Sequence, residues 1–267
     1  MGKSERLRLS DVRAAYRLVG ECRDLGADPA AWRGHVASSL GGLTGSLVCM
    51  VAEAANPPDD TTPGRMLHAV SHGWASPRAH EIWGSYNRRG LYFREPVIRA
   101  IQGYANRRSV CSRDQAVDDP TWFGSTFFNE TLRACELKDM LVSFFDMPCR
   151  ARQSLISVLR PLGARAFRRQ ERLMIRLFHT ELALHFGVSL ATLDDPSPSG
   201  VAPRLHDTLR CLIEGDSEKQ IAARLGLSKA TVHQYVQAVY RHFRVSSRPE
   251  LMAYFLRRSG FQLPERQ

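Results

Sequence analysis

The stretch Ser217–Phe243 constrains the fold more than any other part of this chain, because it has the spacing of a helix-turn-helix motif. Gly226 supplies the turn, since glycine readily adopts the positive φ that ends a helix. Ala222 lies four residues earlier, where a small side chain lets two helices cross closely. Ser228 is expected to cap the second helix by accepting from its free backbone N–H groups. The residues predicted to form the buried stripe of that helix are Val232, Val236, Val239 and Phe243.

The opposite face of the second helix is polar and small enough to enter a DNA major groove, as a recognition helix does. Phosphate contacts are expected from Lys219 and Arg241. Ser228 and Thr231 are expected to cap this helix and to reach phosphate as well. The side chains predicted to contact base edges are Lys229, His233, Gln234 and Gln237. The alternative is a helical C-terminus that contacts another protein and binds no DNA.

Two further short helices flank the motif, within His206–Glu214 and Pro249–Arg258, so four helices are predicted between about 203 and 258. With these flanks the chain resembles the LuxR/GerE family of bacterial DNA-binding domains. The resemblance implies a four-helix domain that binds double-stranded DNA, and a homodimer is expected because two half-sites multiply specificity. It is carried by Pro203-Arg204, Leu209, Leu212, Glu214-Gly215, Ser217, Ile221-Ala222, Leu225, Leu227-Ser228, Thr231-Val232, Val245 and Arg248.

Four positions depart from the family pattern. Leu205 stands where an acidic residue is usual, and Gln220 stands where Glu is usual. Arg244 replaces a glycine, so the last turn is expected to form without a free left-handed residue, at a cost of roughly 1 kcal/mol. His233 stands where Lys is frequent, and because it lies on the DNA face, the family's base preference is not transferred to this chain.

Charge and composition agree with a nucleic-acid partner. The net charge is +10, and residues 201–267 carry 11 Lys or Arg against 6 Asp or Glu. No apolar run approaches the roughly 20 residues that span a bilayer. No two of the six cysteines form a C-x-x-C pair. This favours free thiols in a reducing cytoplasm over disulfides or a zinc site. Phosphate-loop, nucleophile-elbow and H-E-x-x-H motifs are absent, so we expect no enzyme, no cofactor and no metal.

The segment Asp194–Gly200 is rich in Pro, Ser and Gly and predicts a linker. We therefore expect a domain at 1–193, a linker at 194–202 and the helix-turn-helix domain at 203–267. In the first domain the predicted helices are Leu9–Leu25, Ala30–Leu40 (ending at Gly41-Gly42), Ser76–Asn87, Pro96–Tyr104 and Ala164–Phe186. The predicted strands are Gly45–Glu53, Arg65–Trp74, Leu141–Met147 and Ser154–Leu159. Together they indicate an α+β sensor-like domain, an antiparallel sheet with flanking helices of the GAF or PAS kind.

Aromatic and acidic residues between 83 and 122 resemble the pattern of acyl-homoserine-lactone receptors. The residues that carry the resemblance are Trp83-x-x-Tyr86, Tyr92-x-x-Glu95-Pro96-Val97 and Trp122. In that family the Trp and Tyr bind the lactone and acyl carbonyls, and an Asp accepts from the amide. Here Glu95 replaces that Asp, with an arm one methylene longer. Two alternatives remain: a site for a different small molecule, or ordinary core aromatics beside a helix that starts at Glu95-Pro96.

Three other features are interpreted as structural. His68 and His72 share one face of a predicted strand, but no further metal ligand is matched to them. An arginine cluster begins the long helix and is expected to be a solvated face; its members are Arg165, Arg168, Arg169 and Arg172. Asp11 lies on a helical pattern, which argues against a phosphorylated receiver domain.

These inferences together predict a cytoplasmic transcriptional regulator. Its N-terminal domain is expected to sense a small molecule or to control dimerisation. The alternatives are a protein-interaction module on a ligand-binding domain, and a quorum-sensing receptor for an acyl-homoserine lactone.

Overall fold

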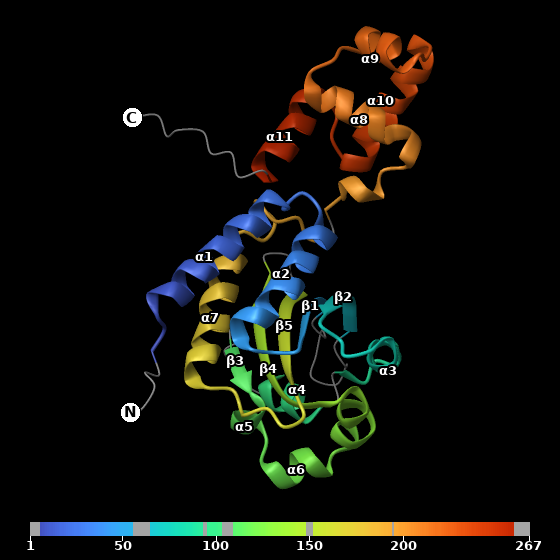
Figure 1. Cartoon of the computed structure of the whole chain (residues 1–267). Coiled ribbons are helices and arrows are strands. Elements are labelled where there is room, and N and C mark those ends of the chain that lie inside the picture. The colour runs from blue at the N-terminus through green and yellow to red at the C-terminus, as the bar shows by residue number, and fades with distance from the viewer. Residues whose placement is uncertain are drawn as a thin grey trace. The chain divides into compact units, whose positions relative to one another are not determined.

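The computed structural model describes residues 6–55, 65–92, 95–102, 109–147, 152–193 and 195–258. The chain divides into two compact units (Figure 1). The N-terminal unit comprises Met1–Cys22 and Ala30–Phe186, and the C-terminal unit comprises Arg23–Pro29 and Gly187–Gln267. A separate hydrophobic core lies in each unit, so each forms a fold of its own.

A five-stranded antiparallel sheet frames the N-terminal unit, with strand order β2-β1-β5-β4-β3. The strands are β1 (Val48–Ala55), β2 (Arg65–His72), β3 (Ser109–Ser112), β4 (Leu137–Asp146) and β5 (Arg152–Pro161). The central strands β1, β5 and β4 are buried along most of their length, because helices cover both faces of the sheet. Val51 of β1 lies opposite Val70 of β2 and Ile156 of β5, so β-branched pairs line this register.

One face of the sheet packs against the helices α1 (Leu9–Asp24), α2 (Pro29–Thr44) and α7 (Arg169–Ala183) (Figure 1). His179 of α7 is fully buried there. Its Nδ1 lies 2.7 Å from Ser143 Oγ of β4, and its Nε2 lies 2.9 Å from Ser154 Oγ of β5. Burial lowers the pKa of His179 to about 3. The imidazole is therefore neutral and ties α7 to two strands through both of its nitrogens.

The other face carries an aromatic core beneath shorter elements. These are α3 (Pro77–Arg88), α4 (Pro96–Gln102), α5 (Arg113–Ala116), α6 (Asp119–Gly124), a π-helical turn (Phe127–Leu132) and a 3₁₀ turn (Arg133–Cys135). Large side chains from these elements meet apolar residues of β1, β4 and β5. The aromatic members of this core are Trp83, Tyr92, Trp122, Phe127, Phe128 and Phe144.

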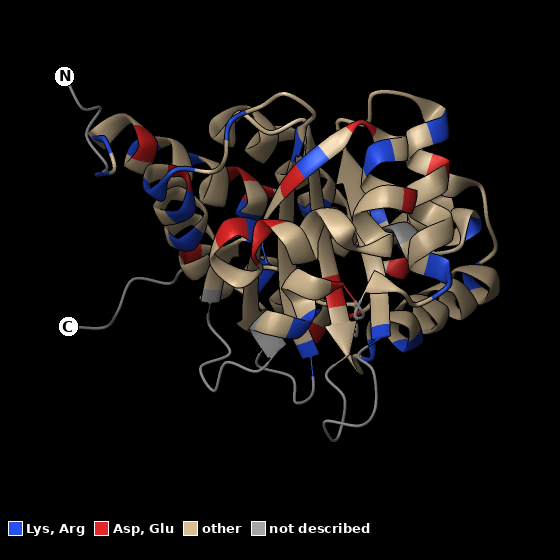
Figure 2. Cartoon of the chain, turned by 90° about the horizontal axis from the view of Figure 1, so that it is seen from below, with Lys and Arg blue, Asp and Glu red and all other residues tan. Residues whose placement is uncertain are grey.

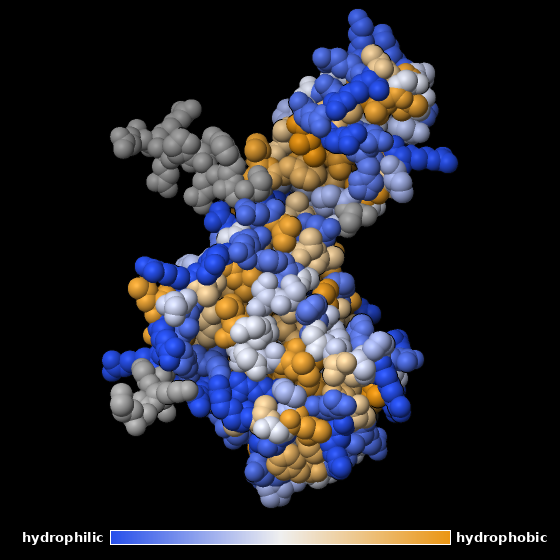
Figure 3. Space-filling model, viewed as in Figure 1, coloured by the Kyte–Doolittle hydropathy of each residue, from blue (hydrophilic) through white to orange (hydrophobic). Residues whose placement is uncertain are grey.

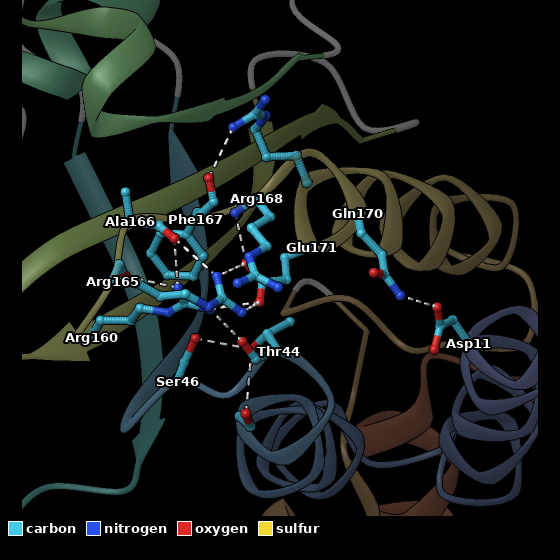
Figure 4. Close-up of polar contacts among 12 residues, drawn as sticks. Asp11, Thr44, Ser46, Arg160, Arg165, Ala166, Phe167, Arg168, Gln170 and Glu171 are labelled. Carbon is cyan, nitrogen blue, oxygen red and sulfur yellow. Dashed lines mark hydrogen bonds and ion pairs between the residues drawn. The ribbon is translucent and has the colours of Figure 1, made fainter. Parts of the chain in front are cut away.

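A buried arginine of β5 holds the connection between β5 and α7 (Figure 4). Arg160 Nη1 donates to the carbonyl oxygens of Arg165 and Ala166, each at 2.8 Å. Its Nη2 donates to Thr44 O at the end of α2, at 2.9 Å, and lies 2.8 Å from Glu171 Oε1 in the first turn of α7. Because the carbonyls of residues 165 and 166 point to Arg160, these residues lie outside the helix.

The predicted architecture is confirmed: an antiparallel sheet with flanking helices, followed by four helices. Several predicted boundaries are wrong. The second helix passes through Gly41-Gly42 and ends at Thr44, and α7 begins at Arg169. The last predicted residues of the fourth helix, 103 and 104, lie outside the described residues. The strand β3 and the short helices after it were not predicted.

The helical pattern of the first helix puts Val12, Tyr16 and Val19 on one face. In the structure the buried residues of α1 are Ala15, Leu18, Val19 and Cys22. Tyr16 is 51% exposed, so the buried stripe is the adjacent one and shares only Val19 with that face.

The C-terminal unit contains the four predicted helices. They are α8 (Pro203–Glu214), α9 (Glu218–Leu225), α10 (Lys229–Phe243) and α11 (Arg248–Arg258). Their apolar stripes meet in one core, to which Val232, Val236, Val239 and Phe243 all contribute as predicted. At the turn before α11, Arg248 donates to the carbonyl oxygens of Asp216, at 2.8 Å, and Leu212, which satisfies the end of α8.

The segment Asp195–Val201, which precedes α8, is bound to the helices α10 and α11; we call it the docked segment. Asp195 Oδ1 lies 2.9 Å from the Arg258 guanidinium. The Tyr254 hydroxyl donates to the carbonyl oxygen of residue 196, and His242 Nε2 lies 2.9 Å from that of residue 197. Val201 is buried in the core of the unit. This part of the predicted linker therefore belongs to the C-terminal fold.

Charged and hydrophobic residues are intermixed in the views of Figures 2 and 3. Acidic and basic residues are interspersed over the helices in Figure 2. Hydrophobic residues occur in small groups among hydrophilic ones on the face shown in Figure 3. Among the described helices, none combines the length and the hydropathy that a membrane span requires.

Candidate DNA-binding surface and buried ligand site

Local capping geometry shapes the helix-turn-helix. Ser217 begins α9, and its backbone N–H donates to Gln220 Oε1 at 2.9 Å. Gly226 ends α9 with φ +64°, as predicted, and donates to Ala222 O. Ser228 Oγ accepts from the backbone N–H of Thr231 at 3.1 Å, so it caps α10 as expected. The turn thus satisfies its backbone groups locally and fixes how α10 leaves it.

The side chains predicted to contact DNA lie on the solvent side of this motif. Val232, Val236 and Val239 of α10 are buried, and His233, Gln234 and Gln237 between them are exposed. Thr231 is half-buried. The exposed members of the predicted set are Lys219, Ser228, Lys229, His233, Gln234, Gln237 and Arg241. The exposed face of α10 therefore offers amide, imidazole and cationic groups along one helix side.

In the N-terminal unit, the predicted ligand residues meet in the aromatic core. The Trp83 ring centroid lies 6.1 Å from that of Tyr86 and 6.4 Å from that of Tyr92. Phe127 joins Trp83, at 6.2 Å, to Trp122, at 5.7 Å. Trp83 and Trp122 are buried and Tyr86 is half-buried. These five aromatic residues therefore form one cluster on the sheet.

Two members of the predicted set already have hydrogen-bond partners. The Trp122 indole N–H donates to Lys138 O at 3.1 Å, and the Tyr86 hydroxyl donates to Leu91 O at 3.0 Å. Tyr92, which belongs to the same sequence pattern but was given no ligand role, has its hydroxyl 2.9 Å from Ser157 Oγ. Because these groups are satisfied within the chain, they are suited to shape a site rather than to supply free hydrogen bonds.

Glu95 and Trp83, in contrast, have buried polar atoms without hydrogen-bond partners among the described residues. Glu95 is 0% exposed, yet neither carboxyl oxygen has a hydrogen-bond partner among the described residues. The Trp83 indole N–H is also buried without one. Burial raises the pKa of Glu95 well above its ordinary value. It also raises the phenol pKa of Tyr86 and of Tyr92, and the nearby Glu95 carboxyl adds to both shifts.

The histidines and arginines interpreted as structural lie apart from this cluster. Burial and the nearby Arg33 lower the pKa of His68, on the edge strand β2. Arg165 is exposed and ion-paired with Glu171. Within the described part of the chain, no three His, Cys, Asp or Glu side chains lie together where they could hold a metal ion.

Comparison with known families identifies the type of domain in the C-terminal unit. Residues 202–255 match the family model for bacterial regulatory proteins of the luxR family. The C-terminal domain is a LuxR-family DNA-binding domain. Its four helices cover the length of the match, and no curated protein matches the chain as a whole.

Several solved structures are similar to the chain at low identity. SdiA of Escherichia coli is 14% identical with a TM-score of 0.45, over 92% of this chain and 97% of SdiA. CepR2 of Burkholderia cenocepacia, described as an N-acylhomoserine-lactone-dependent LuxR-family transcription factor, is 11% identical (TM-score 0.43; 64% and 92% covered). The GAF3 domain of Slr1393 from Synechocystis is 15% identical (TM-score 0.35; 56% and 85% covered).

Sequence reasoning missed one charged residue on the surface of the LuxR-type domain. Glu218, in the first turn of α9, lies with both carboxylate oxygens 3.3 Å from His233 Nδ1. This contact restrains the His233 ring on the recognition helix and places an acidic group beside it. A Glu three residues before Ile221 is a usual helix-start residue, so its second role is visible only in three dimensions.

Arg244 replaces the glycine that is usual after α10, and it adopts the left-handed conformation itself, at φ 53° and ψ 41°. Its N–H donates to Arg241 O at 3.2 Å. A non-glycine residue in this region costs roughly 1–2 kcal/mol.

Arg244→Gly is therefore expected to stabilise the LuxR-type domain by about 0.5–1 kcal/mol, because part of the relief is offset by the greater freedom of glycine in the unfolded chain. Calorimetry of the full chain should show the transition of this domain at a higher temperature. Arg244→Ala is the control, since it removes the same side chain and keeps the strain. Equal shifts for both variants would contradict the explanation.

Proposed function

We propose that the protein is a transcriptional regulator that binds double-stranded DNA through α9 and α10 and binds a small molecule in its N-terminal unit. The LuxR-type domain with its exposed polar recognition face carries the first half of this proposal. The unsatisfied polar atoms of Glu95 and Trp83 support the second half. We place its action in the cytoplasm and expect no catalytic step.

On DNA, Lys219 and Arg241 would contact phosphates and position the domain. The base-reading candidates remain Lys229, His233, Gln234 and Gln237, all on the exposed face of α10. Ser228 and Thr231 already cap the helix, so any phosphate contact from them would use a remaining hydroxyl lone pair. We propose a homodimer, because one domain of this size contacts few base pairs.

In the N-terminal unit, we propose that the ligand lies against the aromatic cluster of Trp83, Tyr86 and Trp122. Glu95 and the Trp83 indole would supply its hydrogen bonds. A buried polar group without a partner costs about 1–3 kcal/mol, so several such atoms in one unit are suited to hydrogen-bond a ligand. The residues 1–193 would then form the sensing domain, and 194–202 the connection to the DNA-binding domain.

The DNA-binding half is tested with two substitutions on the exposed surface. Lys219→Ala is expected to weaken binding to all sequences and to reduce the slope of log K against log salt by about one. Gln234→Ala is expected to relax base preference at one position of each half-site, at roughly 1–3 kcal/mol for the preferred base. Titration at several salt concentrations and selection from random duplexes measure the two effects.

Arg13→Ala, an exposed change of equal charge on α1, is the matched control and should leave the salt slope unaltered. An unaltered slope for Lys219→Ala, or an unaltered selected sequence for Gln234→Ala, would remove that residue from the DNA contacts. If the full chain fails to retard random duplex DNA at low salt, the protein-interaction alternative replaces DNA binding.

A further inference from the structure

We propose that the small molecule bound by the N-terminal unit carries a cationic nitrogen, such as a protonated amine, that pairs with Glu95 inside the aromatic cluster. This inference rests on the ligand-binding function proposed above and names the chemical class of the ligand. It also predicts a hydrogen-bond acceptor elsewhere on the same molecule, directed at the Trp83 indole.

This inference starts from the partners of the buried acidic side chains. Among the described residues, the buried acidic side chains are Glu53, Glu95 and Asp139. Glu53 lies between two guanidinium groups, 2.5 Å from that of Arg33 and 2.6 Å from that of Arg152. Asp139 lies 3.6 Å from the Arg113 guanidinium. Each of these carboxylates therefore has an arginine of the chain within ion-pair distance.

Glu95 is the exception, since it has no such partner among the described residues and is the most completely unsatisfied of the three. Its backbone is fully used: its N–H donates to Tyr92 O at 3.2 Å and its carbonyl accepts from Arg99 N at 2.9 Å. The side chain alone lacks partners. Because no described residue supplies the counter-charge that arginine provides at the other two acids, we assign that role to the ligand.

The surroundings of Glu95 favour a cation over a neutral donor. A neutral donor can add only a hydrogen bond to this carboxyl, whereas a cation forms a neutral, hydrogen-bonded pair with its ionised form. The Glu95 carboxyl lies near the Tyr86 and Tyr92 phenols, whose pKa values it raises, and aromatic faces attract cations when they are shielded from water. Burial raises the pKa of Glu95, so binding of a cation should release its proton.

The Trp83 indole defines the second requirement. Its N–H is a donor only, is buried and has no acceptor in the described chain. A ligand oxygen would satisfy it. The rest of the cluster is apolar, with Trp122 and Phe127 in contact, so the body of the ligand is expected to be hydrocarbon or aromatic.

The test uses the purified full-length protein and chemically matched probes. A panel of primary alkylamines and arylalkylamines is compared with the N-acetyl derivative of each, which keeps the skeleton and removes the charge. Thermal unfolding screens the panel, and isothermal titration in two buffers of different ionisation enthalpy measures affinity and proton release. At least one amine is expected to bind at least 30-fold more tightly than its N-acetyl derivative, with release of about one proton.

Three variants assign the effect to Glu95. Glu95→Gln keeps the shape, removes the charge and is expected to reduce amine affinity at least 100-fold. Trp83→Phe keeps the ring and should reduce affinity about tenfold while the preference for the amine persists. Glu81→Gln, an exposed change on α3, should alter neither quantity.

The opposite results separate the inference from the function on which it rests. Equal binding of N-acetyl derivatives, undiminished binding to Glu95→Gln, or no response to any amine would overturn the cationic class. Native mass spectrometry that shows a neutral molecule co-purifying with the protein, and lost from Glu95→Gln, would also overturn it but would uphold ligand binding at this site. A ligand retained by both Glu95→Gln and Trp83→Phe would reject the proposed site itself.

Discussion

Glu53→Ala is expected to lower the free energy of unfolding of the N-terminal unit by about 3–5 kcal/mol. Arg33 is 1% exposed and would remain buried without the carboxylate 2.5 Å away. Its guanidinium also lies 4.2 Å from the Trp32 ring centroid, a contact that holds it in the core. Urea unfolding of the full chain, followed at the transition of this unit, measures the effect.

The double variant Glu53→Met with Arg33→Met is the control, since it removes both charges and retains side-chain volume. It should recover most of the lost stability, because two well-packed apolar side chains replace a buried ion pair at little net cost. If the double variant is as unstable as Glu53→Ala, the loss comes from packing and the uncompensated Arg33 charge is not its cause.

Replacement of Glu95, unlike that of Glu53, is expected to raise the free energy of unfolding. Glu95→Met should stabilise the ligand-free N-terminal unit by about 1–3 kcal/mol at neutral pH, because it removes a buried carboxyl without hydrogen-bond partners. The same variant should no longer respond to the ligand, so stability and binding change in opposite directions. A loss of stability would show that the carboxyl is satisfied in the folded protein.

The pH dependence of stability should identify this carboxyl. Burial raises the folded-state pKa of Glu95 above the value of about 4.5 of the unfolded chain. The folded state therefore keeps a proton that the unfolded chain releases, and the associated stability is complete below pH 4.5. It decreases by about 1.4 kcal/mol per pH unit as pH rises toward the folded-state pKa. Glu95→Gln should remove this component between pH 5 and 8; identical profiles for variant and parent would contradict it.

Local sequence signals predicted the helix-turn-helix because each of its parts is determined within a few residues. Gly226, Ser228 and the valines of α10 act on neighbours in the same motif, and the structure places them as predicted. The limits of α7 depend instead on Arg160, which binds carbonyls of the preceding loop from a different strand. The sequence of residues 164–168 gives no sign of that contact, so the start of α7 could not be predicted from it.

The candidate ligand site was only partly predictable. The spacing of Trp83, Tyr86 and Trp122 indicated aromatic residues that share a region, and Glu95 stood out beside Pro96. Which polar atoms are free depends on distant partners: Trp122 is satisfied by a carbonyl of β4, whereas Trp83 is not. Whether a buried polar atom has a partner can be read only from the three-dimensional structure, because the partner belongs to a separate element of the fold.

The docked segment changes how the DNA-binding half should be isolated or exchanged with that of another regulator. A fragment that starts at Pro203, where the helical pattern begins, would leave Tyr254, His242 and Arg258 without the partners described above. A chimera joined between residues 196 and 199 would likewise separate parts of these contacts between two parents. A junction before Asp195 keeps the docked segment with α10 and α11.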